Sequence, residues 1–137
     1  MRCGTLLAQK NKLWIIKALD RASRKTVGWV LGRRSAATFK KLYKSVEHLT
    51  DCKFYTDAWD AFSKILPPER HIIGKAGTVA IEQDNSNTRH YIGRMTRRTK
   101  IVSKTEEMVD TTLLLWSALT DPEIFGRYQK LAISSFK

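Results

Sequence analysis

Two apolar runs decide the start of this fold: Leu13-Trp14-Ile15-Ile16-Lys17-Ala18-Leu19 and Thr26-Val27-Gly28-Trp29-Val30-Leu31. Both are rich in β-branched and aromatic residues, which favour strands. The mostly polar residues 20–25 between them predict a hairpin with a six-residue loop. Ser35 follows at an N-cap position, and apolar residues recur at helical spacing over 39–49. This pattern predicts a helix of about fourteen residues.

Weaker patterns predict short strands over 52–56 and 71–73 and helices over 58–65 and 78–95. A capping box over Ser103–Glu106 predicts a helix that continues through Leu119. Asp121-Pro122, a cap followed by Pro, predicts the start of a last helix. The resulting order is strand, strand, helix, strand, helix, strand, helix, helix, with a first strand missing or degraded at the front. We expect a mixed sheet flanked by helices. This α/β order resembles the ribonuclease H-like fold.

Length and composition limit the class of protein. The 137 residues, 42% of them hydrophobic, predict one domain over 1–137, with an atypical start over 1–9 and C-terminal helices over 105–137. No run of eighteen apolar residues is present, and the start lacks the apolar segment of a signal peptide. Cys3 and Cys52 have no CxxC or His partner at ligand spacing, which argues against zinc or a disulfide framework. We expect a cytoplasmic protein, with Cys52 a small buried hydrophobe.

The charge is large and uneven. The formal net charge is +12, and residues 1–50 contain twelve Lys and Arg against two Asp and Glu. Residues 70–104 contain eight against two, whereas residues 105–137 contain three against five. Such a basic chain favours a polyanionic partner. The basic stretches lack the apolar face with which a helix enters a membrane surface, so nucleic acid is favoured over a membrane.

Two carboxylates and a cation form a candidate catalytic set. Asp57 follows a predicted buried strand, and open α/β sheets bind ligands at that edge. Glu82 lies twenty-five positions later on a predicted helix, and Arg89 lies seven residues further on the same face. Two acids that converge on Mg²⁺ or Mn²⁺, with a cation beside them for a phosphate, match metal-dependent phosphoryl transfer.

Each of these residues also has a simpler interpretation. A single Asp after a strand is most often a helix cap, and Asp57 could cap residues 58–65. Glu82 alone could be a solvated helix residue. Arg89 and the bases after it could form a hydrated basic face. No nucleophile motif or Walker loop is present.

Residues 12–115 contain seven segments, in order, that resemble the catalytic part of the insertion-sequence-one family of bacterial transposases. The segments are Leu19–Lys25, Gly32–Ser35, Tyr55–Trp59, His71–Lys75, Ile81–Arg89, Arg94–Lys100 and Ser103-Lys104. The resemblance implies a ribonuclease H-like fold and an Asp, Asp, Glu catalytic set. In it Asp57 is the second Asp, Glu82 is the Glu, and Arg89 is the basic residue seven positions on.

The start of the chain departs from the family. The first Asp of the family stands in an Asp-Glu-x-Trp motif, where this chain has residues 1–9 without an acid. Nucleotides that encode Met1-Arg2-Cys3-Gly4 can encode Asp-Glu-Met-Trp in another frame. We therefore hypothesise an N-terminally truncated or frame-disrupted reading frame, and upstream nucleotides without that reading would contradict it. Asp20 could replace the missing Asp, although a turn residue is the simpler interpretation.

We expect a transposase catalytic domain that cleaves insertion-element ends and joins them to target DNA, with activity impaired by the loss of one Asp. Asp57 and Glu82 are the expected ligands of Mg²⁺ or Mn²⁺. The expected DNA contacts are Lys75, Arg89, Arg94, Arg97, Arg98 and Lys100. The alternatives are a non-catalytic DNA-binding remnant that inhibits intact transposase and, less favoured, a basic structural or RNA-binding protein. Expected partners are double-stranded DNA at the nucleoid, further copies of the chain, or a full-length transposase.

Overall fold

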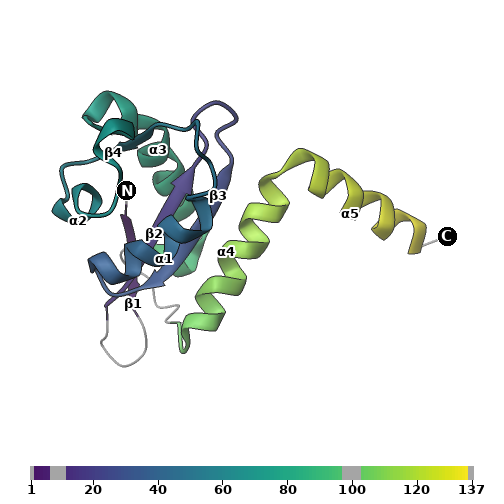
Figure 1. Cartoon of the computed structure of the whole chain (residues 1–137). Helices are drawn as coiled ribbons and strands as arrows, with labels where there is room; N and C mark the ends of the chain where they lie inside the picture. Colours follow the sequence, from purple (N-terminus) through teal and green to yellow (C-terminus); the bar gives the residue numbers. More distant parts are fainter. Residues whose placement is uncertain (1, 7–11, 97–102, 136–137) are drawn as a thin grey trace.

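The computed structural model describes residues 2–6, 12–96 and 103–135 (Figure 1). Its strands are β1 (Arg2–Leu6), β2 (Lys12–Leu19), β3 (Thr26–Gly32), β4 (Phe54–Thr56) and β5 (His71–Ile73). Its α-helices are α1 (Ala36–Val46), α2 (Asp60–Ser63), α3 (Lys75–Tyr91), α4 (Glu106–Thr120) and α5 (Pro122–Ser135). Two short 3-10 turns are η1 (Pro68–Arg70) and η2 (Gly93–Met95).

The first three strands form an antiparallel sheet in the order β1-β2-β3. Ile16 of β2 pairs with Arg2 on one side and Val30 on the other. The hairpin of β2 and β3 and its polar connection are confirmed. The expectation of a missing or degraded first strand is wrong, because β1 pairs with β2 over its whole length. Strand pairing needs backbone N–H and C=O groups, which Arg2–Leu6 supply without the apolar pattern used to recognise a strand.

The two short strands form a sheet of their own. β4 and β5 are parallel, with Phe54 opposite His71 and Thr56 opposite Ile73. The mixed α/β architecture is confirmed, but the described strands form two sheets and not one mixed sheet. Among the described strands, β4 pairs with β5 and not with β1.

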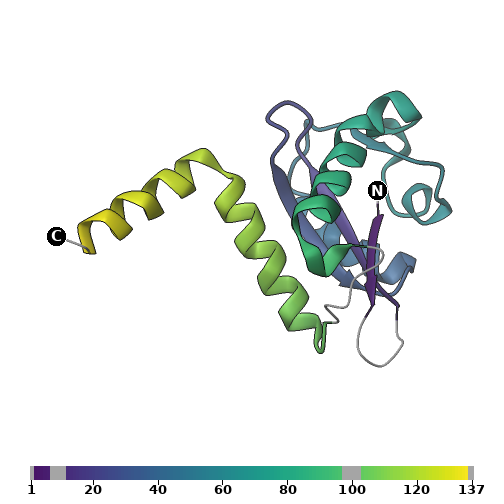
Figure 2. The same ribbon diagram turned by 180° about the vertical axis from the view of Figure 1, so that it is seen from behind.

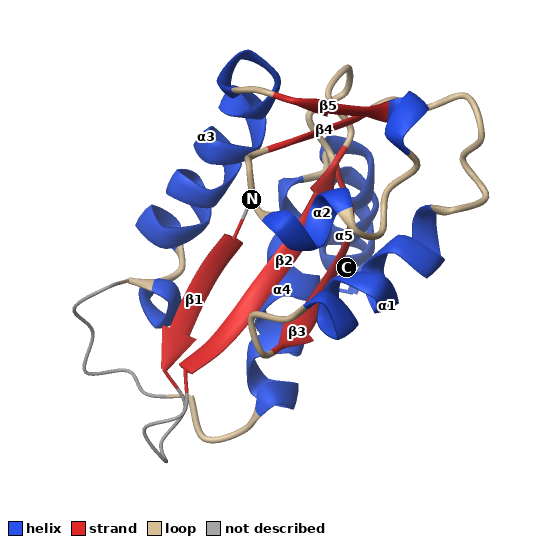
Figure 3. Cartoon of the chain, turned by 60° about the vertical axis from the view of Figure 1, so that its left-hand side comes forward, coloured by secondary structure: helices blue, strands red, loops and turns tan. Residues whose placement is uncertain are grey.

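Side chains of the first sheet alternate between two apolar cores. Leu13 and Ile15 pack with Val109 and Leu113 of α4, whereas Ile16 packs with a cluster formed by α1 and α2. The helices therefore cover both faces of this sheet (Figure 3). The alternation follows from the two-residue period of a strand.

The predicted helix starts are mostly confirmed. The Ser35 side chain accepts a hydrogen bond from the Thr38 amide at the start of α1. Asp121 precedes Pro122 of α5, and its carboxylate accepts from the Glu123 and Ile124 amides. The N-cap of α4 is Thr105, not Ser103, because Ser103 is buried while Thr105 accepts from the Met108 amide. None of the described helices is both long and apolar enough to cross a membrane.

Candidate functional site

Asp57 lies where the sequence predicts it, directly after β4. Its side chain is half-buried, and Oδ1 accepts a hydrogen bond from the Trp59 amide at 3.2 Å. Trp59 is the N-cap residue of α2 and has no side-chain cap of its own. The carboxylate therefore does take part in starting α2, as the simpler interpretation holds. This contact also fixes where the carboxylate lies.

The Thr56 hydroxyl links the backbone at Asp57 to the neighbouring strand β5. The Thr56 hydroxyl donates to the Asp57 carbonyl at 3.0 Å and lies 2.6 Å from His71 Nε2 on β5. Because the hydroxyl proton is used for the carbonyl, the imidazole must donate from Nε2. Burial lowers the pKa of His71, which favours this neutral donor. The end of β4 is thus fixed by β5.

Glu82 is exposed on α3 and is held by its own helix. Its Oε1 accepts from the hydroxyl of the buried Thr78 at 3.2 Å. Arg89, half-buried, lies seven residues further along α3 and so on the same side of the helix. Lys75, the first residue of α3, lies seven residues before Glu82 and is also exposed. The predicted alignment of Glu82 and Arg89 on one helix face is therefore present.

The elements that carry the two acids are neighbours. A Cβ on Gly77 of α3 would collide with the ring of Tyr55 on β4 and come within 2.8 Å of its Cβ. Tyr55 stands two residues before Asp57, and Gly77 lies about 7.5 Å along the helix axis from Glu82. No group of three His, Cys, Asp or Glu that could hold a metal occurs among residues 2–6, 12–96 and 103–135. The donors present are thus two carboxylates on adjoining elements.

Asp20 is a turn residue in the structure. Its carboxylate accepts from the amides of Ala22 and Ser23 and from the Ser23 hydroxyl, at 2.5 to 3.2 Å. These hydrogen bonds, that of the Ser23 hydroxyl first, lower the pKa of Asp20. The carboxylate closes the loop between β2 and β3, and it belongs to no three-donor group in the described chain.

Sequence reasoning missed a buried ion pair between β2 and α3. Lys17 is 6% exposed, and its Nζ donates to Asp84 Oδ2 at 2.7 Å and to the Thr88 hydroxyl at 2.9 Å. A Lys inside a strand that is apolar on both faces is the signal that could have revealed it, because a buried ammonium requires a partner. On the same helix Asn85 is 1% exposed, and neither polar atom of its side chain has a hydrogen-bond partner among the described residues.

The predicted basic contacts are only partly described. Lys75 is exposed at the start of α3, and Arg94 on η2 donates to the Ser103 hydroxyl at 3.4 Å. Arg97, Arg98 and Lys100 lie outside the described residues. Of the predicted DNA contacts, the described residues therefore include Lys75 and Arg89 on α3 and Arg94 just after that helix.

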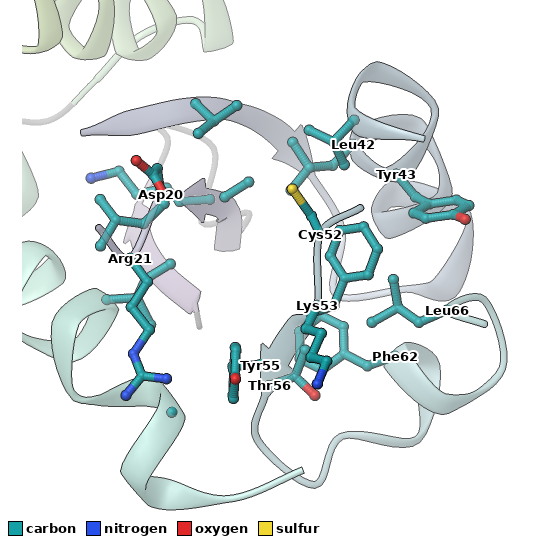
Figure 4. A pocket seen from close by; sticks show the side chains of 18 of the residues that line it. Asp20, Arg21, Leu42, Tyr43, Cys52, Lys53, Tyr55, Thr56, Phe62 and Leu66 are labelled. Carbon is teal, nitrogen blue, oxygen red and sulfur yellow. The ribbon is translucent and has the colours of Figure 1, made fainter. Parts of the chain in front are cut away.

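A cavity of about 430 Å³ lies between the end of β2, α1, β4 and the start of α3 (Figure 4). Most of its lining is apolar, and at its edge the Arg21 guanidinium lies 4.8 Å from the centre of the Tyr55 ring. Cys52, expected to be buried, is exposed and belongs to this lining. Neither Asp57 nor Glu82 lines the cavity, so it is distinct from the two carboxylates.

Comparisons with known proteins relate most of the chain to one family. The model of the family described as IS1 transposase matches residues 3–116. The insertion element IS1 protein InsB of Shigella flexneri is 30% identical over 110 residues, which cover 80% of this chain and 84% of that protein. The insertion element IS1 2 protein InsB of Escherichia coli K12 is 29% identical over 110 residues, 80% of this chain and 66% of that protein. No solved structure matches.

Proposed function

Because the chain belongs to the IS1 transposase family, we propose that it acts on double-stranded DNA in the transposition of an insertion element. The observation that carries this proposal is the position of Asp57 at the end of β4, beside the helix that carries Glu82 and Arg89. The high positive charge outside the C-terminal helices supports a DNA partner.

A ribonuclease H-like fold is part of the proposal. Three antiparallel strands come first, two parallel strands follow, and helices cover both faces of the first sheet. This element order is the one expected from the family resemblance. In this order of elements, Asp57 follows β4 and Glu82 lies on the neighbouring helix α3.

We propose Asp57 and Glu82 as ligands of Mg²⁺ or Mn²⁺. Carboxylate oxygens are the donor type that these ions prefer. The number of donors fits less well, because no third carboxylate joins them in the described chain and Arg2–Leu6 of β1 contain no acid. The site is therefore incomplete for the metal, and we derive no cleavage step through it. Strand cleavage and strand transfer should be impaired.

In this proposal the basic side chains hold DNA. Arg89 contacts a phosphate or base near the two carboxylates. Lys75, Arg94, Arg97, Arg98 and Lys100 contact the phosphate backbone with little sequence preference.

The incomplete acid set favours one alternative function. A chain that binds DNA without cleaving it would compete with an intact transposase for the same sites. We propose that such interference is the activity of this chain if cleavage is lost.

Nicking of supercoiled plasmid in Mg²⁺ or Mn²⁺ separates the two functions. The chain is compared with Asp57→Ala and with a variant in which Asp-Glu-Met-Trp replaces Met1-Arg2-Cys3-Gly4 behind a new initiator Met. We expect nicking near background for the chain and metal-dependent nicking for the restored variant. Adding Asp57→Ala to the restored variant should abolish that nicking. A restored variant that binds DNA but never nicks it would contradict the assignment of Asp57 and Glu82.

A further inference from the structure

Helix α4 is apolar on two opposite sides. Val109 and Leu113 are almost fully buried against the first sheet, whereas the next residues Leu114 and Leu115 are 58% and 56% exposed. A helix that is apolar all round is normally buried all round. The outer face of α4, formed by Leu114, Leu115 and Leu119, is therefore left uncovered by the part of the chain that the structure describes.

Helix α5 presents a second uncovered apolar face. None of its residues is buried, and four of its large apolar residues, Ile124, Phe125, Tyr128 and Leu131, fall on one side of the helix, with Ile133 on the other. Figures 1 and 2 show α5 leading away from the two sheets. The family model ends at residue 116, so this helix lies beyond the part of the chain that the family accounts for.

The joint between α4 and α5 keeps these two faces apart. Asp121 caps α5 through the Glu123 amide, and its other oxygen lies 2.6 Å from the Lys25 ammonium on the β2–β3 loop. The hydrogen bond from Lys25 lowers the pKa of Asp121 and keeps the carboxylate ionised. Because Asp121 is bound to the loop, the start of α5 is fixed and the helix does not fold back onto its own α4.

We infer that the covering surface is a second copy of this chain, with each α5 lying antiparallel on the outer face of the α4 of the partner. Each chain carries two uncovered faces, one on α4 and one on α5. A two-fold symmetric dimer therefore buries all four faces at once, whereas a different protein with a single apolar face would cover only one of them. Because α5 already leads away from its own body, the exchange requires neither body to open.

Charge favours the antiparallel orientation. Residues 1–104 contain twenty-two Lys and Arg against eight Asp and Glu, whereas residues 105–137 contain three against five. Because the proposed contact joins two helices of the acidic segment, its orientation depends on where the charges stand along α4 and α5. In the antiparallel orientation, Glu106 and Glu107 at the start of α4 lie near the C-terminal half of the partner helix, which carries Lys130. A parallel orientation would place Glu123 there.

The mass of the full chain in solution tests the inference. Sedimentation across the micromolar range should give twice the 15.8 kDa of the chain. Leu131→Glu on the apolar face of α5 should shift the mass to the monomer, while near-ultraviolet circular dichroism shows that the body stays folded; the thermal midpoint should fall with the loss of association. Gln129→Glu, which adds the same charge on another side of α5, should remain a dimer. A monomer at every concentration, or a dimer that Leu131→Glu leaves intact, would overturn the inference.

Cysteine pairing tests the exchange itself. In a chain with Cys3→Ser and Cys52→Ser, Leu115→Cys and Tyr128→Cys are made separately and then mixed under oxidation. We expect the disulfide to form chiefly in the mixture, between α4 of one copy and α5 of the other. Disulfides formed as readily by Tyr128→Cys alone would show α5 pairing with α5 and would contradict the exchange.

Discussion

The Lys17 ammonium on β2 lies 2.7 Å from the Asp84 carboxylate on α3, joining residues 67 positions apart. Lys17 also donates to Thr88, one turn further along α3, so two contacts fix how this helix is rotated about its axis. Glu82 stands about 200° around the helix from Asp84. The buried pair therefore turns Glu82 away from Lys17 and leaves its carboxylate exposed, on the side that also carries Arg89.

Removal of one partner of this pair should destabilise the fold. Asp84→Ala leaves a buried, unpaired ammonium, which costs about 3 kcal/mol or more. Urea unfolding followed by circular dichroism measures the loss. The control Glu82→Ala, at an exposed position two residues away, should change the free energy of unfolding by less than about 0.5 kcal/mol. Lys17→Met together with Asp84→Leu should recover most of the stability, and no recovery would contradict the role given to the charge.

The close approach of α3 to β4 is a second target. Gly77→Ala places a methyl group against Tyr55, and the overpacking should cost about 1 to 3 kcal/mol. Tyr55→Gly in the same chain removes both the ring and the Cβ and should relieve the collision. Gly74→Ala is the control, because a Cβ there meets nothing within 4 Å. Because Ala has a higher helix propensity than Gly, a Gly77→Ala chain as stable as the parent, or more stable, would contradict the close contact with β4.

Stability should fall in mild acid through His71. Its pKa is lowered in the folded chain by burial, so the unfolded chain binds more protons as pH drops below about 6.5. The free energy of unfolding should therefore decrease as pH falls from 7 toward the lowered pKa of the folded chain. His71→Gln keeps an N–H for the Thr56 hydroxyl but does not titrate, so its unfolding should depend less on pH. Equal slopes for the two chains would contradict this account.

The α3 cations should set the salt dependence of DNA binding. Lys75→Ala and Arg89→Ala should each lower the slope of log affinity against log salt by about 0.9, because each removes one phosphate contact. Fluorescence anisotropy on duplexes of unrelated sequence measures the slope. Arg127→Ala on α5 is the control and should leave the slope unchanged. An unchanged slope for both α3 variants would place the DNA elsewhere.

Local patterns were enough to predict much of the fold. The hairpin of β2 and β3, strand β5, the Ser35 cap and the Asp121-Pro122 start of α5 all depend on neighbouring residues, and all are confirmed. The positions of Asp57 after a strand and of Glu82 and Arg89 on one helix face are local in the same sense. Side-chain periodicity and capping act within a few residues, so the sequence displays them directly.

Only the tertiary structure decided how distant segments meet. The pairing of β1 with β2, the division of the strands into two sheets and the burial of Lys17 against Asp84 depend on contacts across the chain. The ion pair between Asp121 and Lys25, which are 96 positions apart by their residue numbers, is likewise a contact that no local pattern displays. Residue types determine where a helix or strand begins and ends. Packing of the whole chain determines which charge finds which partner and which apolar face remains uncovered, because those contacts compete with many others of similar energy.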